Sequence, residues 1–295
     1  MLFTLAIALL SGATALYVKN GRLGFKSKKK SASQVTNVEA FRHFCKNAVA
    51  SPQLFAHFKS DPIYTLFYEN ASEEEGRVHL SLIGQRTPEL LSPAILEKVS
   101  LNDTLGSPKT YHFEGAGTFS PTTLRYLKVA SDLKRSFQSL DGMKIIEIGG
   151  GYGGQCKILF DLFDIASYTI IDLPEGLELT KKYLQALGVT SRVHFLKPTQ
   201  VESQECDLLI SNYGFTESSA ALQSHYFDAL LRRAPRGYMT CNFFYKHFRV
   251  RPWTKEGLLK KLSSLPIKMH VLPEEPQIGE ENFVVIWSPA TAEVL

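Results

Sequence analysis

IIEIGGGYGG, residues 145–154, is a short apolar strand that runs directly into a turn containing five glycines. Tyr152–Phe163, which overlaps the end of this stretch, has the pattern of a helix. Glycines between a strand and a helix let the chain turn tightly and let its backbone approach a ligand closely. The stretch therefore predicts a ligand-binding turn within an α/β sheet.

The residues after this turn alternate between strand and helix patterns. Further strands are predicted at Tyr168–Ile171, Val193–Leu196, Leu208–Ser211 and Tyr238–Phe243, with helices at Pro174–Leu187, Glu217–Arg233 and Thr254–Ser264. Ile267–Leu272 and Phe283–Trp287 are two strands with only a loop between them, which makes them antiparallel. Alternating strands and helices predict a doubly wound parallel sheet with helices on both faces, here ending in an antiparallel strand pair.

The residues before the turn have a different pattern. Ser120-Pro121 begins a predicted helix, because Ser is a good N-cap and Pro suits the first helical position. Residues 38–118 carry mainly helical apolar spacing, with β-prone runs at Ile63–Tyr68 and Val78–Ile83, and we expect a mostly helical lobe there. Residues 119–295 then form the sheet domain.

The glycine pattern fits two cofactors. Gly149, Gly151 and Gly154 satisfy G-x-G-x-x-G, the dinucleotide fingerprint. Glu147, Gly149, Gly151 and Gly153 also satisfy E-x-G-x-G-x-G, and a carboxylate before the glycines suits a cofactor with a positively charged amino acid end, such as S-adenosylmethionine. In both cases Asp172, at the end of the next strand, is placed to hydrogen-bond the ribose hydroxyls.

The order of elements favours the second cofactor. A helical lobe precedes the turn, a single sheet follows it, and the chain ends in an antiparallel pair, which is the arrangement of S-adenosylmethionine methyltransferases. Four segments resemble the sugar O-methyltransferases of bacterial surface-glycan and secondary-metabolite clusters: IIEIGGGYGGQ (145–155), YTIIDLPEGLELTKKYL (168–184), DLLISNYGFTES (207–218) and GYMTCNFF (237–244). SPTTLRY (120–126) resembles the segment that these proteins carry before the glycine turn.

This resemblance implies a Rossmann-like methyltransferase fold, S-adenosylmethionine as cofactor, and a sugar or glycan-precursor hydroxyl as acceptor. The residues expected to bind the cofactor are Glu147, Gly149, Gly151, Gly153, Asp172, Arg125, Ser211 and Asn212. Lys197-Pro198 follows the third strand, where the wider superfamily has an acid. The likeness covers about residues 120–245 and is weak in the lobe.

In-line methyl transfer to a hydroxyl needs alignment of the reactants and a general base for the proton. Glu217, just after the fourth strand, is the first candidate base, although a position at a helix start would lower its pKa through the helix dipole. His225 is the second candidate, because histidine titrates near neutral pH. Eight residues of helix separate the two by roughly 12 Å, so they would not act on one proton together.

Composition excludes several classes of function. The four cysteines form no C-x-x-C pair, which argues against a zinc knuckle or a disulfide scaffold, and no metal-ligand spacing is present. Six of the 33 Lys and Arg lie between Lys19 and Lys30, which leaves 27 basic against 29 acidic residues elsewhere. The body therefore has no basic footprint for nucleic acid.

Residues 1–30 have the pattern of a targeting segment. Residues 1–18 are uncharged and mostly apolar, and the basic linker at 19–37 follows them. Positive charge after the apolar core favours a single N-terminal membrane anchor with the catalytic domain in the cytosol. A cleaved signal peptide, with secretion, and a buried N-terminal helix are the alternatives.

The sequence thus predicts a membrane-anchored methyltransferase with a sugar or glycan-precursor substrate. A nicotinamide-dependent oxidoreductase on the same glycine turn, and a non-catalytic protein that keeps the fold as a binding module, are the rival interpretations.

Overall fold

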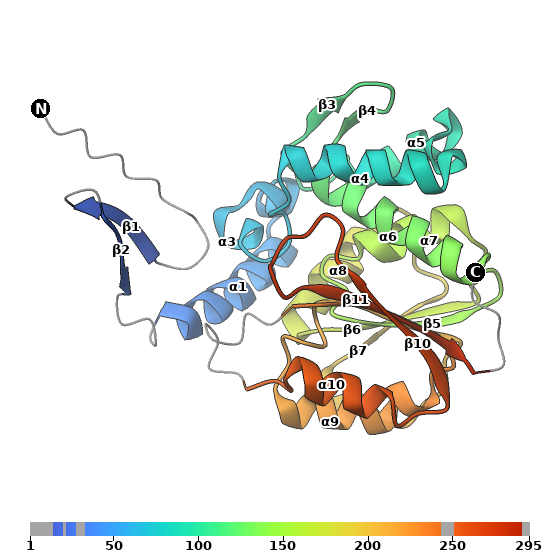
Figure 1. The fold of residues 1–295 in the computed structure, drawn as a ribbon. Coiled ribbons are helices and arrows are strands. Elements are labelled where there is room, and N and C mark those ends of the chain that lie inside the picture. Colours follow the sequence, from blue (N-terminus) through green and yellow to red (C-terminus); the bar gives the residue numbers. More distant parts are fainter. Residues whose placement is uncertain (1–13, 20–21, 28–32, 243–250, 291–295) are drawn as a thin grey trace, which may run out of the picture.

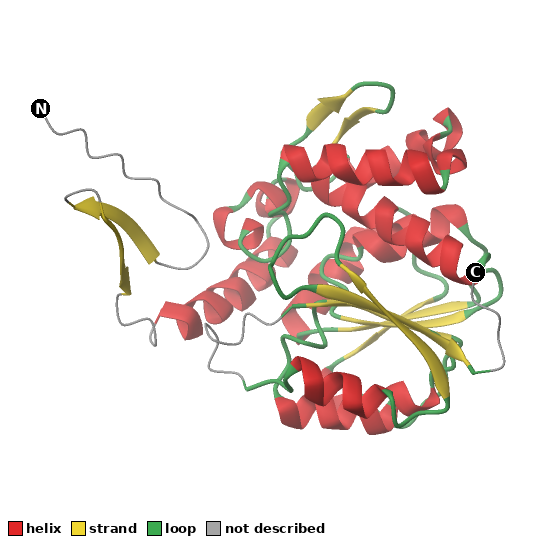
Figure 2. Ribbon diagram, in the orientation of Figure 1, coloured by secondary structure: helices red, strands yellow, loops and turns green. Residues whose placement is uncertain are grey.

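The computed structural model describes residues 14–19, 22–27, 33–242 and 251–290. Its main sheet has seven strands in the spatial order β10-β11-β9-β8-β5-β6-β7. Their bounds are Lys144–Ile148 (β5), Ser167–Ile171 (β6), Val193–Leu196 (β7), Leu208–Asn212 (β8), Gly237–Cys241 (β9), Ile267–Pro273 (β10) and Phe283–Pro289 (β11). Figures 1 and 2 show this twisted sheet between two layers of helices.

The strand directions confirm the predicted fold class. β5, β6, β7, β8 and β9 pair in parallel, whereas β11 is antiparallel to both β9 and β10. The last strand of the chain is therefore inserted between the fifth and sixth strands of the sheet. A dehydrogenase-type sheet has six parallel strands and no such insertion, so this order is that of the methyltransferase fold.

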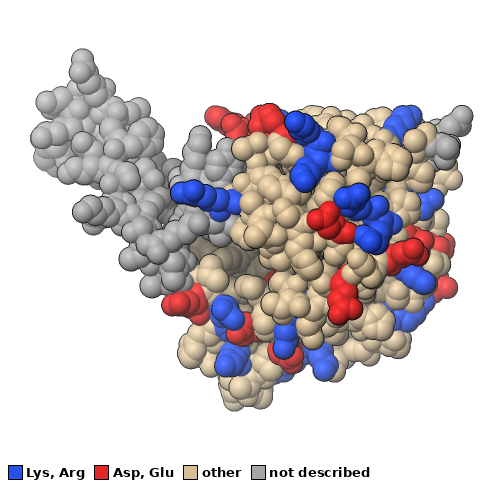
Figure 3. All heavy atoms as spheres, turned by 90° about the horizontal axis from the view of Figure 1, so that it is seen from below, with Lys and Arg blue, Asp and Glu red and all other residues tan. Residues whose placement is uncertain are grey.

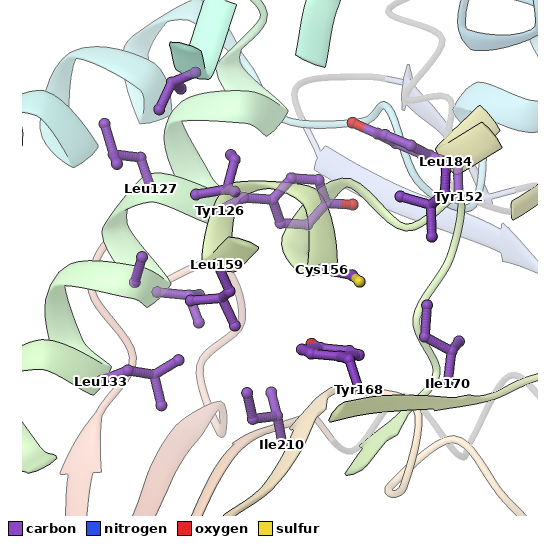
Figure 4. Packing of buried hydrophobic residues seen from close by; sticks show 14 of the residues in the cluster. Tyr126, Leu127, Leu133, Tyr152, Cys156, Leu159, Tyr168, Ile170, Leu184 and Ile210 are labelled. Carbon is purple, nitrogen blue, oxygen red and sulfur yellow. The ribbon is translucent and has the colours of Figure 1, made fainter. Parts of the chain in front are cut away.

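Two hydrophobic clusters cover the two faces of the sheet. The first contains side chains of α6 (Pro121–Phe137), α7 (Gly154–Leu162) and α8 (Pro174–Ala186), together with the lobe. Figure 4 shows part of it, with Tyr126, Tyr152 and Leu184 facing Tyr168, Ile170 and Ile210 of the strands. The second packs α9 (Ala220–Ala229) and α10 (Lys255–Leu262) against the opposite face. The doubly wound arrangement is thus as predicted.

The lobe precedes α6 and is mostly helical. Its helices are α1 (Ser33–Ala50), α2 (Pro52–Ala56), α3 (Pro62–Thr65), α4 (Glu73–Arg86) and α5 (Pro93–Ser100), with 3-10 turns at Phe58–Ser60, Pro88–Leu91 and Leu101–Asp103. A two-stranded hairpin, β3 (Tyr111–Phe113) and β4 (Gly117–Phe119), was not predicted. The run Val78–Ile83 lies in α4, not in a strand.

A capping box explains that helix. The Ser72 hydroxyl accepts a hydrogen bond from the Glu75 N–H, and the Glu75 carboxylate accepts one from the Ser72 N–H. Two N–H groups at the helix start are thereby satisfied. Local capping decides the structure here over the strand preference of the following residues.

Only part of the segment predicted to be the N-terminal anchor lies within the described residues. Residues 1–13 of the predicted anchor lie outside the described residues, and Thr14–Lys19 (β1) pairs with Arg22–Ser27 (β2) as an antiparallel hairpin. Among the described residues, no helix is both long and apolar enough to cross a bilayer. The predicted linker also ends early: α1 begins at Ser33, because a helix extends cooperatively beyond the residues that first bury an apolar face.

Candidate functional site

The glycine turn lies where the loops after β5 and β8 touch. Gly149 has a φ of +82°, and a Cβ placed on it would come within 2.8 Å of Gly214 Cα. A Cβ on Gly214 would in turn lie 2.7 Å from the Ile148 carbonyl oxygen. Two backbones meet without side chains between them, and only glycine allows this approach.

The Ser211 side chain hydrogen-bonds to both of these loops. Its hydroxyl donates to the Ile148 carbonyl over 3.0 Å and accepts from the Phe215 N–H over 2.9 Å. The side chain is fully buried. Ser211 was expected to bind the cofactor; in the structure its donor and one acceptor lone pair bind the two loops, so the side chain positions the turn.

Asp172 is bound to the glycine turn, as expected for a residue at the end of β6. Its Oδ2 accepts from the Gly151 N–H over 3.0 Å, and its Oδ1 accepts from the Leu173 N–H over 2.7 Å. Desolvation raises the pKa of Asp172 to about 6, against the effect of these two bonds. Each carboxylate oxygen keeps further acceptor capacity.

Glu147 lies beneath the turn rather than in front of it. It is 1% exposed and accepts a hydrogen bond from the Tyr168 hydroxyl over 3.0 Å. Burial raises the pKa of Glu147 to about 8. Its Oε2 is 3.2 Å from where a Cβ of Gly150 would stand, so the carboxyl group supports the turn from below.

Glu217 lies after β8 and faces the same side of the molecule. Its Oε1 accepts a hydrogen bond from Asn242 Nδ2 over 2.7 Å, and Asn242 Oδ1 accepts one from the Thr216 hydroxyl over 3.0 Å. The residue is accessible to solvent, yet desolvation by the surrounding protein raises the pKa of its carboxyl. The expectation of a lowered pKa is wrong, because α9 begins at Ala220 and Glu217 precedes its N-cap, Ser219.

Asp172 and Glu217 both follow parallel strands at the carboxyl edge of the sheet, and we call the part of that edge between their two loops the recess. The charge of Glu217 contributes to raising the pKa of Asp172, although the two residues come from loops after different strands. Figure 3 shows the surface hollowed beside the atoms drawn grey. Ligands of doubly wound sheets bind at this edge.

A tyrosine of the lobe also lies on the glycine turn, and no sequence motif pointed to it. Two ring carbons of Tyr68 lie 2.8 Å from where a Cβ of Gly151 would stand. Arg125, which was expected to reach the cofactor, donates to the Tyr68 carbonyl over 3.1 Å. Arg125 therefore holds the segment that carries Tyr68.

His225 and Asn212 do not join the recess through any described contact. His225 is exposed on α9, with Nε2 2.9 Å from the Val201 carbonyl oxygen. We discard it as a base, since the backbone of the β7–β8 connection already binds its ring. Asn212 Oδ1 accepts from the Thr240 hydroxyl over 3.1 Å, whereas its Nδ2 is buried without a partner.

The described residues contain no group of three or more His, Cys, Asp or Glu side chains that would hold a metal ion. The four cysteines are all buried and free. Burial raises the pKa of Cys45 and Cys206 to about 12, which keeps these two thiols protonated.

No protein-family model matches the chain, and the comparison with curated proteins finds no match. Solved structures with a similar backbone include the methyltransferase domain of bacterial CtHen1, at 14% identity and a TM-score of 0.44 over 57% of this chain and 97% of that one. An rRNA methylase from Streptococcus thermophilus has 16% identity and a TM-score of 0.42, over 56% of this chain and 96% of that one. A putative methyltransferase from Streptococcus mutans, solved with S-adenosylhomocysteine, has 17% identity and a TM-score of 0.41, over 54% of this chain and 96% of that one.

Proposed function

We propose that this protein is an S-adenosylmethionine-dependent methyltransferase that acts on a hydroxyl group. One observation carries the proposal: Asp172, hydrogen-bonded to the glycine turn, and Glu217, hydrogen-bonded to Asn242, both follow parallel strands at the carboxyl edge of a methyltransferase-type sheet. A carboxylate for a ribose and a carboxylate for a proton are thereby supplied by two adjacent loops.

The residues of the turn suit an adenosyl cofactor. Gly149 and Gly151 both have a positive φ, the backbone conformation that glycine adopts without strain in a tight ligand-binding turn. Asp172 would hold the ribose hydroxyls, and Glu147 supports the turn. When bound, S-adenosylmethionine supplies an electrophilic methyl group.

Glu217 is the base in this proposal. Its Oε1 is held by Asn242, which leaves Oε2 to accept the proton of an acceptor hydroxyl. Desolvation makes this carboxylate more basic than one in water, which improves proton transfer from a weak acid. The Asn242 hydrogen bond favours the ionised form and fixes its orientation.

A sugar or glycan precursor is the acceptor class we propose, supported by the resemblance of residues 120–245. We also propose that residues 1–30 associate with a membrane, supported by their apolar and basic pattern. Deleting these thirty residues is expected to move the protein from the membrane fraction to the soluble fraction. An unchanged distribution would contradict the membrane role alone.

Calorimetric titration of the purified protein with S-adenosylhomocysteine, and in parallel with NAD, tests the cofactor. We expect binding of S-adenosylhomocysteine only, followed by methyl transfer from labelled S-adenosylmethionine to members of a glycan panel. Binding of NAD alone would favour an oxidoreductase. Binding of neither, or of S-adenosylhomocysteine without any turnover, would favour a binding module.

A further inference from the structure

Tyr68 reaches the glycine turn from outside the sheet domain. Its ring carbons Cδ1 and Cε1 lie against Gly151, at the point where the turn has a φ of +55°. Any side chain at residue 151 would collide with the ring. Gly151 is therefore needed for this contact as well as for its own backbone conformation.

The ring is fixed in place from behind. Arg125 Nη2 donates to the Tyr68 carbonyl, and the Tyr68 ring packs at 5.7 Å from the ring of Phe41 and 5.3 Å from that of Tyr64. Aromatic packing of this kind holds a ring in a defined orientation. Tyr68 is thus a rigid wall on the glycine turn.

The Tyr68 ring lies on Gly151, whose N–H donates to Asp172, so Tyr68 stands beside the residues of the proposed cofactor side. The charges of Asp172 and of Glu217 each contribute to raising the pKa of Tyr68 well above its usual value. A phenol kept protonated is a hydrogen-bond donor. Asp172 belongs to the proposed cofactor side of the recess and Glu217 to the proposed acceptor side.

A tyrosine of the glycine turn is also buried against the lobe. Tyr152 is fully buried, and its ring packs against Phe58 at 5.9 Å and lies beneath the ammonium of Lys59 at 4.1 Å. Lys59 is itself fully buried and donates to the Asn102 carbonyl. Tyr68 of the lobe thus packs on the glycine turn, and Tyr152 of the turn packs in the lobe. These two contacts together fix the position of Tyr68 relative to Gly151.

We propose that Tyr68 is a lobe residue of the cofactor site, with its ring as the wall over Gly151. This inference rests on the proposed function, because it assumes that the recess binds S-adenosylmethionine. It assigns the helical lobe a direct part in ligand binding, which neither the sequence resemblance nor the sheet domain provides.

Calorimetric titration with S-adenosylhomocysteine tests the wall. We expect Tyr68→Ala to raise the dissociation constant by about 10-fold or more, because an aromatic contact is lost, and Tyr68→Phe to change it by less than about 3-fold. Tyr64→Phe is the matched control, since Tyr64 is a buried tyrosine of the same segment that packs in the same aromatic group. It should leave the constant within about 2-fold.

A spectroscopic readout separates direct contact from loss of folding. The full protein labelled with 3-fluorotyrosine gives fluorine resonances, and those of residues 68 and 64 are assigned by their absence in Tyr68→Phe and Tyr64→Phe. Saturation with S-adenosylhomocysteine is expected to shift the resonance of residue 68 more than that of residue 64.

The outcomes distinguish the two proposals. If the wild-type protein binds S-adenosylhomocysteine, while Tyr68→Ala binds within about 2-fold of it and the fluorine resonance of residue 68 does not move, only the assignment of Tyr68 is overturned. If the wild-type protein does not bind S-adenosylhomocysteine, the proposed function and the assignment of Tyr68 both fail.

Discussion

Glu217 is the residue on which the proposed chemistry depends most. Glu217→Gln keeps the size of the side chain and its contact with Asn242 but removes the base. We expect turnover to fall by about 10²–10⁴-fold with little change in S-adenosylhomocysteine affinity. The same assay on His225→Gln should show near wild-type turnover, because His225 is exposed and bound to a backbone carbonyl. Full activity of Glu217→Gln would remove the base assignment.

Asn242 sets the pH range of that base. Its hydrogen bond opposes the desolvation that raises the pKa of Glu217. A base acts when deprotonated, so turnover should rise with pH through the pKa of Glu217. Asn242→Ala removes a bond to the charged form, and we expect the acidic limb of the kcat profile to move to higher pH. A limb that stays in place or moves to lower pH would contradict this coupling.

Glu147 makes stability depend on pH in the opposite sense to most carboxylates. Its folded pKa of about 8 lies above the ordinary value of 4.5, so the folded state holds a proton that the unfolded state has lost between these pH values. Stability therefore falls as pH rises from about 4.5 to 8, by up to ~1.4 kcal/mol per unit. Glu147→Gln should lose this slope when urea unfolding is measured across the range; an identical slope would show that Glu147 is not responsible.

The residues of the site were predictable where they follow a strand. Asp172 and Glu217 stand directly after β6 and shortly after β8, and the edge at which parallel strands end is fixed by their direction. Tyr68 could not be found in this way, because its position depends on how a lobe without a motif packs on Gly151. The contacts of Ser211 could not be predicted either, since sequence position does not reveal which partners a hydroxyl takes.

The contact between the β5 and β8 loops is the key feature at the scale of elements. Gly149→Ala would place a Cβ 2.8 Å from Gly214 Cα, at a φ of +82°. Gly188 offers a matched control with a φ of +74° and nothing within 4 Å of an added Cβ. Both variants carry the left-handed strain of roughly 1–2 kcal/mol.

We expect Gly149→Ala to lose on the order of 1–3 kcal/mol more than Gly188→Ala, because the two backbones must separate. It should also bind S-adenosylhomocysteine more weakly, whereas Gly188→Ala should bind it normally. Urea unfolding and calorimetry of both variants measure these differences. Equal losses of stability would mean that the loops separate freely.

The elements of the sheet domain were predicted better than those of the lobe for a physical reason. Each strand of the parallel sheet is a short apolar run bounded by glycine, proline or polar residues, and such runs have few alternatives. In the lobe, short helices depend on caps such as Ser51 and Ser72, which override the strand preference of the residues that follow. The hairpin β3–β4 carries only three residues per strand, too few for a periodic pattern.

At the scale of the whole molecule, the lobe and the sheet domain share one core. The first hydrophobic cluster runs from Phe41 and Phe58 of the lobe to Ile145 and Ile286 of the sheet. The boundary predicted between residues 118 and 119 therefore lies inside a continuous packed interior. Without the lobe, one face of α6, α7 and α8 would be exposed to water.

This shared core predicts that the body of the protein unfolds as one unit. Both tryptophans of the chain, Trp253 and Trp287, pack on the far face of the sheet from the lobe, whereas far-ultraviolet circular dichroism also reports the lobe helices. We expect urea transitions followed by tryptophan fluorescence and by circular dichroism to coincide. Phe58→Ala, which removes a buried lobe ring, should shift both transitions together by roughly 3–5 kcal/mol in unfolding free energy. Circular dichroism that fell before the fluorescence changed would show a lobe that unfolds alone, and the cofactor site would then lose Tyr68 while the sheet stayed folded.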